Sequence, residues 1–185
     1  MAIEVTWIGT AGEPVTLMQQ VAGHVEQIFG DAASVRAARR LPDGAYDVRR
    51  RQYASRALLV TLAGGAGDHK VLGITDVDLF IPVLTFVFGE AQLGGRVAVV
   101  STARLADAGP HGMRARLMKE AVHELGHTYG LVHCASPACA MARSASIAAV
   151  DVKSDRLCGG CRLRLAELMK ESAYVTAHPE NPDRR

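Results

Sequence analysis

The sequence has no long hydrophobic run. Its longest nearly apolar stretch, residues 79–89, is interrupted by Pro82 and is much shorter than the roughly 20 residues that cross a bilayer as a helix. The first residues, 1–5, show neither the basic region nor the continuous apolar region of a secretory signal. We therefore expect no membrane partner and no export by that route, which favours a reducing, cytoplasmic location.

The chain also lacks an excess of charge of either sign. Its 21 Lys and Arg residues are nearly balanced by 19 Asp and Glu residues, which gives a net charge of +2. Nucleic-acid-binding proteins need a broad basic surface that this balance does not supply, so we expect no nucleic-acid partner. We interpret the short basic stretches at residues 39–40 and 49–51 as solvated faces rather than a binding patch.

Cysteine is scarce, with four residues in a chain of 185, which is too few for a disulfide-dense scaffold. With 49% hydrophobic and 22% charged residues, the composition is that of a folded globular protein. We expect one domain over residues 1–175, with an amino-terminal part (1–130) and a carboxy-terminal part (131–175), followed by a disordered tail over 176–185.

Hydrophobic spacing predicts strands and helices mixed through the first two thirds of the chain. The predicted strands cover residues 3–8, 34–41, 71–75, 86–90 and 97–102, with a hairpin at Gly94-Gly95, and the predicted helices cover 14–29 and 53–63. These elements indicate an α/β (α+β) fold in which a twisted mixed sheet packs against helices. Residues 131–155 show no regular period, and 161–174 predict an amphipathic helix through Leu165, Leu168 and Met169.

A longer helix is predicted over residues 110–130, because Pro110 suits a helix start and no further proline follows within this range. Met118, Val122, Leu125 and Tyr129 fall on one stripe of this helix, and His123 and His127 point almost opposite. We expect the helix to pack with one face and to present both histidines on the other.

The pattern His123-Glu124-x-x-His127 places two imidazoles on one helix face, where they can bind a single divalent metal ion. Gly130 follows three residues later and can end the helix in a left-handed conformation. Three residues further, His133 supplies a third imidazole. The long pattern is far more specific than its five-residue core.

Three neutral imidazoles leave a zinc ion with an open position for water, whose pKa zinc lowers to about 7. Glu124 is then the natural general base for the attack of that water on a peptide carbonyl. This chemistry is metal-assisted amide hydrolysis. A purely structural role for the three histidines is the alternative. The remaining histidines have no such spacing and are interpreted as ordinary residues: His24, His69, His111 and His178.

A methionine and four cysteines follow this pattern in a fixed order. His133 is followed by Cys134, four residues, Cys139-Ala140-Met141, sixteen residues, and Cys158-Gly159-Gly160-Cys161. This arrangement closely resembles the signature of the archaemetzincin family of zinc metallopeptidases, although the last spacing is one residue shorter than the family's usual seventeen. Residues 72–80 and 86–91 also look like the family, so the resemblance covers most of residues 1–175.

The resemblance implies a metzincin-like fold with two zinc ions per chain. A catalytic zinc would be held by His123, His127 and His133, with Glu124 as general base and Met141 in a tight turn beneath. A structural zinc would be held by the four cysteines, Cys134, Cys139, Cys158 and Cys161, and would staple the carboxy-terminal part. The partner would be a peptide or protein substrate, aminopeptidase-like action on short peptides is permitted, and we expect a monomer.

Several alternatives stay open from the residues alone. The cysteines could form disulfides or, at Cys158 and Cys161, a redox dithiol, although two short-spaced pairs suit a closed zinc site in a reducing compartment. The protein could be a non-catalytic or latent zinc protein that binds peptides or senses metal or redox state. Glu124 speaks against this alternative, because a purely structural zinc site needs no general base. Residues 86–90 are our candidate for an edge strand that pairs with extended substrate. Asp76 and Asp78 could line the cleft or satisfy a sheet edge.

Overall fold

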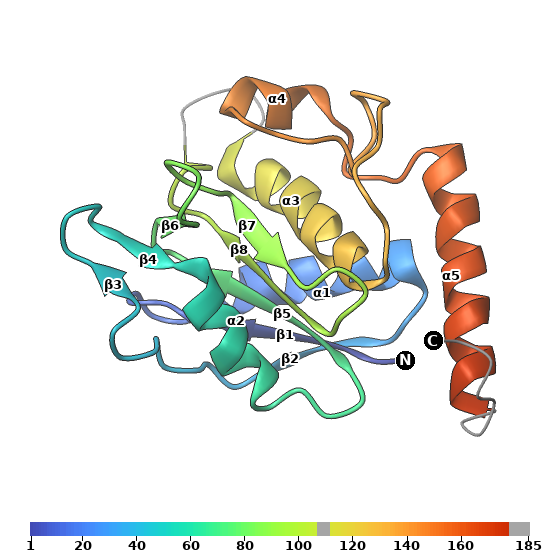
Figure 1. Ribbon diagram of the computed structural model, residues 1–185, viewed down its shortest axis with the longest axis horizontal. Coiled ribbons are helices and arrows are strands. Elements are labelled where there is room, and N and C mark those ends of the chain that lie inside the picture. The colour runs from blue at the N-terminus through green and yellow to red at the C-terminus, as the bar shows by residue number, and fades with distance from the viewer. Residues whose placement is uncertain (107–111, 178–185) are drawn as a thin grey trace.

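The computed structural model describes residues 1–106 and 112–177 and is built around a five-stranded sheet (Figure 1). The strand order is β2-β1-β5-β8-β7, and every neighbouring pair is parallel except β7 and β8, which are antiparallel. The strands are β1 (Ile3–Trp7), β2 (Ala33–Arg36), β5 (Lys70–Thr75), β7 (Gly89–Ala91) and β8 (Val97–Ser101). The antiparallel strand β7 therefore forms one edge of a mostly parallel sheet.

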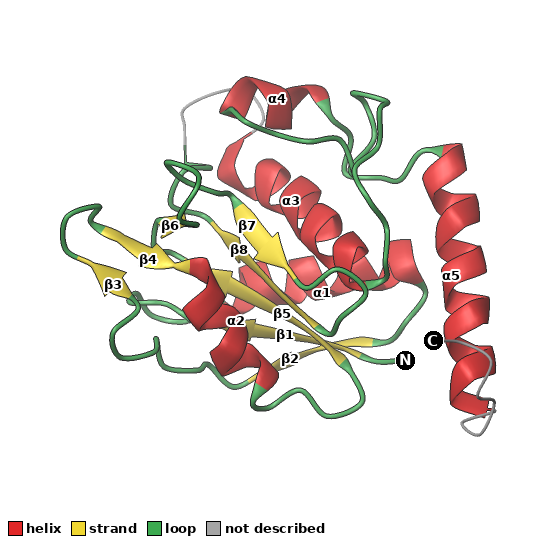
Figure 2. Ribbon diagram, viewed as in Figure 1, coloured by secondary structure: helices red, strands yellow, loops and turns green. Residues whose placement is uncertain are grey.

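Helices cover both faces of this sheet (Figure 2). Apolar residues of α1 (Val15–Phe29) and α3 (Gly112–Thr128) pack in one core cluster, and those of α2 (Ser55–Ala63) pack in another. Successive β8 residues alternate between the clusters, with Ala98 and Val100 in the first and Val97 and Val99 in the second, as the period of two in a strand requires. The predicted mixed sheet packed against helices is confirmed.

A small second sheet lies beside this core and consists of β3 (Tyr46–Asp47), β4 (Gln52–Ala54) and β6 (Leu79–Phe80). Asp78 stabilises this sheet by accepting hydrogen bonds from the side chains of Arg104 and Gln52. Asp76 accepts hydrogen bonds from the backbone and hydroxyl of Thr10 and from the Ala11 N–H. Both aspartates therefore hold neighbouring segments in place, and neither is among the residues that line the cleft beside the histidines.

Several predicted elements have different bounds, and two strands and one helix are informative. The strand predicted over 34–41 ends at Arg36, and beyond it Arg39 turns back to pair with Glu4 and with carbonyls of α2. The strand predicted over 86–90 is regular only from Gly89 to Ala91. The helix predicted from residue 53 begins at Ser55, because Tyr53 and Ala54 pair with β6 instead.

The helix α3 is buried on nearly all sides, and the face that carries His123 and His127 lines a cleft. Residues after Met141 fold over that face and include a short helix, α4 (Ile147–Val152), within the stretch for which no regular structure was predicted. Ser146 caps α4 by accepting a hydrogen bond from the Ala149 N–H, and six residues are too few for a helical period to be visible in the sequence. Pro110 and His111 lie outside the described residues.

The last helix, α5 (Gly159–Ala177), stands at one edge of the molecule (Figure 1). Leu165 is buried and Leu168 and Met169 pack against the core, whereas Tyr174 and Val175 are exposed. The predicted tail overlaps the last two residues of this helix, and its remainder, 178–185, lies outside the described residues. Among the helices of the described chain, none has the length and apolar character needed to cross a membrane.

Candidate metal centres and the cleft beside them

The structure brings the three predicted histidines together. His123 and His127 lie one turn apart on α3, which ends where Gly130 adopts a φ of 93° and donates its N–H to the His127 carbonyl. The chain then reverses, and His133 lies against the other two imidazoles. One ring nitrogen from each histidine falls in a group whose members are all within 4.8 Å of one another.

Backbone carbonyls fix the orientation of two of these rings. The Nδ1 atom of His123 lies 2.9 Å from the Ala140 oxygen, and that of His127 lies 2.7 Å from the Leu131 oxygen. A carbonyl only accepts hydrogen bonds, so each Nδ1 carries the proton and each Nε2 keeps a free lone pair. The two Nε2 atoms are 3.2 Å apart, close to the spacing of about 3.3 Å for two nitrogens on one tetrahedral zinc ion.

The environment of the histidines keeps them neutral. Burial lowers the pKa of His123 well below its usual value, and the charge of Lys153 lowers it further. Burial also lowers the pKa of His127 and His133, and at His133 the charge of Arg143 adds to this shift. A neutral imidazole is the form that binds a metal ion, so the three histidines are in the protonation state that metal binding requires.

Glu124 lies next to the histidines in a space that β7 leaves open. A β-carbon on Gly89 would lie 2.6 Å from the Glu124 Cγ atom, so only glycine fits at this point of the strand. Burial raises the pKa of Glu124 well above its usual value, and the carboxylate of Glu120 adds to this shift. Gly89 was not singled out in the sequence analysis, although it lies in a segment that resembles the family.

Met141 is fully buried below the histidine-bearing helix. A β-carbon on Gly126, which lies between His123 and His127, would be 2.5 Å from the Met141 sulfur. The Met141 carbonyl accepts a hydrogen bond of 2.9 Å from the Cys134 N–H. The methionine turn therefore contacts the helix through its side chain and the segment that carries His133 through its backbone.

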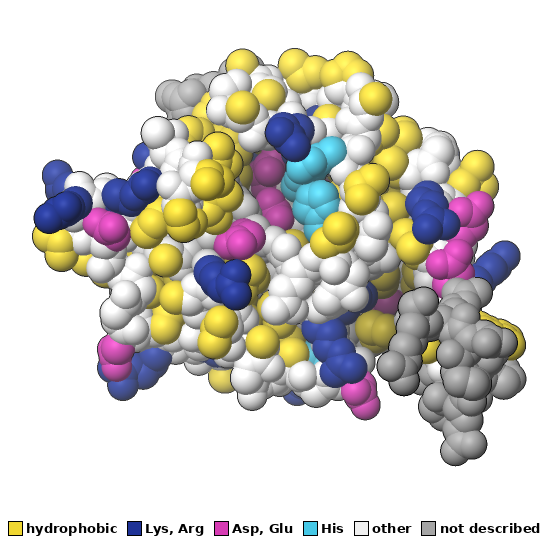
Figure 3. All heavy atoms as spheres, in the orientation of Figure 1, with side chains coloured by type: hydrophobic (Ala, Val, Ile, Leu, Met, Phe, Trp, Pro, Cys, Tyr) yellow, Lys and Arg dark blue, Asp and Glu magenta, His cyan; other side chains and the backbone are white. Residues whose placement is uncertain are grey.

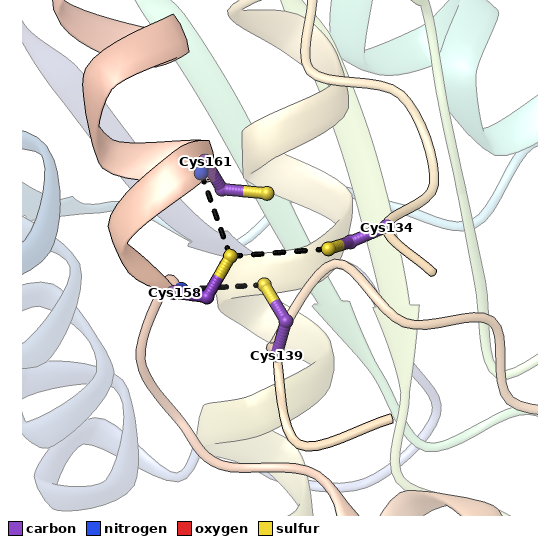
Figure 4. Close-up of side chains that lie close together, drawn as sticks. All are labelled: Cys134, Cys139, Cys158 and Cys161. Carbon is purple, nitrogen blue, oxygen red and sulfur yellow. Dashed lines mark hydrogen bonds between the residues drawn. The ribbon is translucent and has the colours of Figure 1, made fainter. Parts of the chain in front are cut away.

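The four predicted cysteines also converge, with sulfur atoms that all lie within 4.8 Å of one another (Figure 4). The sulfurs of Cys134 and Cys158 are 3.8 Å apart, far beyond the S–S bond length of about 2.05 Å in a disulfide. Two thiolates at about 2.3 Å from one tetrahedral zinc ion would be about 3.8 Å apart. All four cysteines are free, and their spacing fits a metal ion rather than a disulfide.

Backbone N–H groups point at the sulfurs. The Ser136 N–H donates to the Cys134 sulfur. The Cys158 N–H donates to the Cys139 sulfur, and the Cys161 N–H donates to the Cys158 sulfur (Figure 4). The last of these hydrogen bonds is the main cause that lowers the pKa of Cys158 to about 7, whereas burial raises the pKa of Cys139. Such N–H groups stabilise thiolates, which are the form that binds zinc.

A cleft of about 510 Å³ opens beside the histidines. It opens on the face shown in Figure 3, where histidine, acidic and basic side chains are visible close together near the centre. The cleft is lined by residues 84–91, by Glu120, His123, Glu124, His127 and His133, and by residues 143–145. The edge strand β7 thus forms one wall, which is where the sequence placed a candidate strand for substrate pairing.

A buried ion pair that the sequence did not indicate joins the two sites. Lys153, with a fully buried side chain, lies 2.8 Å from the Glu120 carboxylate and 3.4 Å from the His123 Nδ1 atom. It also donates to the Ala142 carbonyl. Lys153 belongs to the loop between Cys139 and Cys158, so this loop is tied to the helix that carries the histidines.

The other described histidines have ordinary partners. His24 contacts Asp155, and His69 lies 3.0 Å from the Glu4 carboxylate. His111 and His178 lie outside the described residues. Neither His24 nor His69 belongs to either group of candidate metal ligands.

Comparison with known proteins places this arrangement in a family. The sequence profile of peptidase family M54 matches residues 14–167. The archaemetzincin of Methanopyrus kandleri is 43% identical over 156 residues, which cover 84% of this chain and 89% of that protein. The crystal structure of the Methanopyrus kandleri archaemetzincin matches with a TM-score of 0.82 at 40% identity, over 91% of this chain and 96% of that one.

A second solved structure agrees with the first. The archaemetzincin of Archaeoglobus fulgidus, crystallised in complex with malonate, matches with a TM-score of 0.77 at 34% identity, over 89% of this chain and 99% of that one. Because the family profile and these relatives span nearly the whole chain, the protein belongs to the archaemetzincins, peptidase family M54, and is a zinc metallopeptidase.

Proposed function

We propose that the protein hydrolyses peptide bonds at the three-histidine site, with Glu124 as general base, and that its preferred substrates are short peptides with a free amino terminus. The observation that carries this proposal is the pair of Nδ1–H groups on His123 and His127, both directed to backbone carbonyls. That arrangement leaves the lone pairs of both Nε2 atoms free to bind a metal ion. One ring nitrogen of each of the three histidines lies within 4.8 Å of the others. These three histidines would hold the catalytic zinc.

Bound there, zinc supplies Lewis acidity, which polarises a carbonyl and lowers the pKa of water. Glu124 takes the proton from the water that attacks the scissile carbonyl and returns it to the leaving amine. Its raised pKa makes the carboxylate a stronger base than an exposed glutamate. Gly89 keeps the space into which this side chain fits.

The four cysteines would hold a second zinc ion with a structural role. Four sulfurs form a closed set of ligands and leave no open position for a substrate. Their loop also carries Lys153 and Met141, which contact the histidine-bearing helix. We therefore expect metal analysis of the purified protein to give two zinc ions per chain.

Glu90 supports the preference for a free amino terminus. It lies on the edge strand β7 in the wall of the cleft, and the Ser55 hydroxyl donates a hydrogen bond to one of its carboxylate oxygens. Its charge reaches Glu124, whose pKa it helps to raise. A carboxylate held in this way beside the reacting groups can accept the ammonium group of a peptide.

A peptide-library digest tests this function. The zinc-loaded protein is compared with Glu124→Ala on peptides with free amino termini and on the same peptides after acetylation. We expect cleavage by the wild type alone and faster cleavage of the free peptides. Equal turnover by both proteins would remove Glu124 from the mechanism, and equal turnover of both peptide sets would remove the preference for a free amino terminus. No turnover by the wild type would favour a peptide-binding protein.

A further inference from the structure

We propose that Arg143 forms a subsite for a carboxylate of the substrate, either the carboxy terminus of a short peptide or an acidic side chain. Arg143 lines the cleft together with the three histidines, two residues after Met141 in the turn beneath them. This inference rests on the proposed use of the cleft for peptide hydrolysis and adds a specificity-determining residue to it.

The guanidinium group of Arg143 is available for such a ligand. Within residues 1–106 and 112–177, no hydrogen bond or ion pair engages its side chain. Other cations near this region are already engaged, since Arg104 pairs with Asp78 and Lys153 pairs with Glu120. An arginine presents a planar set of donors that matches the two oxygens of a carboxylate.

The lining of the cleft contains both signs of charge. Strand β7 contributes Glu90, and the segment 143–145 contributes Arg143. Apolar side chains of Phe86 and Phe88 line the cleft as well. This distribution complements a short peptide with its ammonium group at Glu90 and a carboxylate at Arg143, and it disfavours the reversed orientation.

A role in stabilising the charge of the transition state fits Arg143 less well. Groups that do so are preorganised in a site from which water is excluded. Arg143 is exposed, and its side chain is not held by any described residue. A solvated side chain that can adjust its position is suited to binding a charged group of the substrate. It is less suited to stabilising the negative charge that develops on the reacting carbonyl oxygen.

The test measures a selectivity ratio within each protein. Peptides with a free carboxy terminus are compared with their carboxamides, and carboxamide peptides that contain Glu are compared with those that contain Gln. We expect the wild type to favour the acidic member of at least one pair by about tenfold in kcat/KM, mainly through KM. In Arg143→Ala this ratio falls to near one, in Arg143→Lys it is partly kept, and in Arg143→Glu it is inverted.

The matched control is Arg49→Ala, because Arg49 is also exposed but lies outside the cleft. It should keep the wild-type ratio. The first peptide pair identifies a terminal carboxylate as the ligand, and the second identifies an acidic side chain. An equal loss of kcat on acidic and neutral peptides in Arg143→Ala would overturn the proposal in favour of a transition-state role, and a wild-type ratio near one in both pairs would remove the subsite.

Calorimetry separates this proposal from the proposed hydrolysis. Zinc-loaded Glu124→Gln is titrated with the same peptide pairs, with and without Arg143→Ala. We expect about tenfold tighter binding of the acidic peptide, and loss of this difference when Arg143 is replaced. If wild-type turnover is absent but the binding difference is present, the catalytic proposal fails and the subsite stands. If turnover is present and the binding difference is absent, the subsite fails.

Discussion

Gly89 on the edge strand β7 leaves the space that the side chain of Glu124 occupies. A β-carbon at position 89 would lie 2.6 Å from the Glu124 Cγ atom and 2.5 Å from the Val99 carbonyl oxygen. Gly89 pairs with Val100 in the antiparallel ladder, so its backbone cannot retreat without disturbing β8. The general base that we propose is therefore positioned by a strand distant in sequence as well as by its own helix.

We expect Gly89→Ala to lower kcat by about 100-fold, because even a small misplacement of a reacting group has an effect of this size. Crowding of a packed site should also lower the free energy of unfolding by about 1–3 kcal/mol. Steady-state kinetics, chemical denaturation and metal analysis check this, with zinc content retained. The control is Gly23→Ala in α1, where a β-carbon meets nothing within 4 Å. Full activity of Gly89→Ala would contradict the steric argument.

The adjacency of His133 and Cys134 predicts coupling between the two metal centres. The Cys134 N–H donates to the Met141 carbonyl. The loop that the cysteines close therefore also holds Cys134, which is the residue next to His133. We expect Cys158→Ala to lose the structural zinc and to weaken zinc binding at the histidines by about tenfold or more, although Cys158 does not touch them. Chelator competition with metal analysis measures both affinities.

Ser136→Ala is the control for this coupling, because it changes an exposed side chain in the same loop and keeps the N–H that contacts Cys134. It should leave both zinc affinities unchanged. Loss of one zinc ion from Cys158→Ala with unchanged affinity at the histidines would refute the coupling.

The buried pair formed by Lys153 and Glu120 should behave as a unit. Their side chains are 0% and 3% exposed at a separation of 2.8 Å. Lys153→Met leaves the Glu120 carboxylate buried without its partner, and we expect a loss of about 3–5 kcal/mol in the free energy of unfolding. Adding Glu120→Gln should recover part of this loss. A double-mutant cycle by urea denaturation measures the coupling, and additive losses would show that the two residues act independently.

The sequence predicted the parts of the site that depend on local spacing. His123, His127 and Gly130 follow from the geometry of one helix and its end, and the four cysteines follow from their short-range pairs and the family resemblance. The contacts between distant segments were not visible: Gly89 fits Glu124, and Lys153 pairs with Glu120. A sequence shows which residues share an element, but not which side chains meet across two elements.

The fold follows the same division. The β-branched composition of β8 and the helical spacing in α1 were readable from the sequence. α4 was missed because it is short and is held by α3 rather than by its own amphipathic pattern. Lys119 donates to carbonyls at the end of α4, and Arg116 pairs with Asp151. The same packing explains why the first half of α3 is buried on the side that α4 contacts.

The last prediction concerns the effect of pH on the metal-free protein. Burial raises the pKa of Glu124 above its ordinary value of 4.5, so the native state holds a proton there at pH values at which the unfolded chain has released it. The stability contributed by this group is present below 4.5 and is lost as pH rises toward the native pKa. Glutamine does not titrate, so Glu124→Gln should gain stability relative to the wild type as pH increases.

Urea denaturation in the presence of a chelator, from about pH 4.5 to about pH 8, measures this difference. The histidines titrate in both proteins, so their contribution cancels, and the value at the lowest pH gives the baseline effect of the substitution. We expect the difference to widen with pH until the native pKa is reached and then to level off, which would mean that the carboxylate proposed for catalysis destabilises the metal-free fold above that pKa. A difference that stays constant over the range would show that Glu124 has the same pKa in the native and unfolded states, and its burial would then have no effect on its basicity.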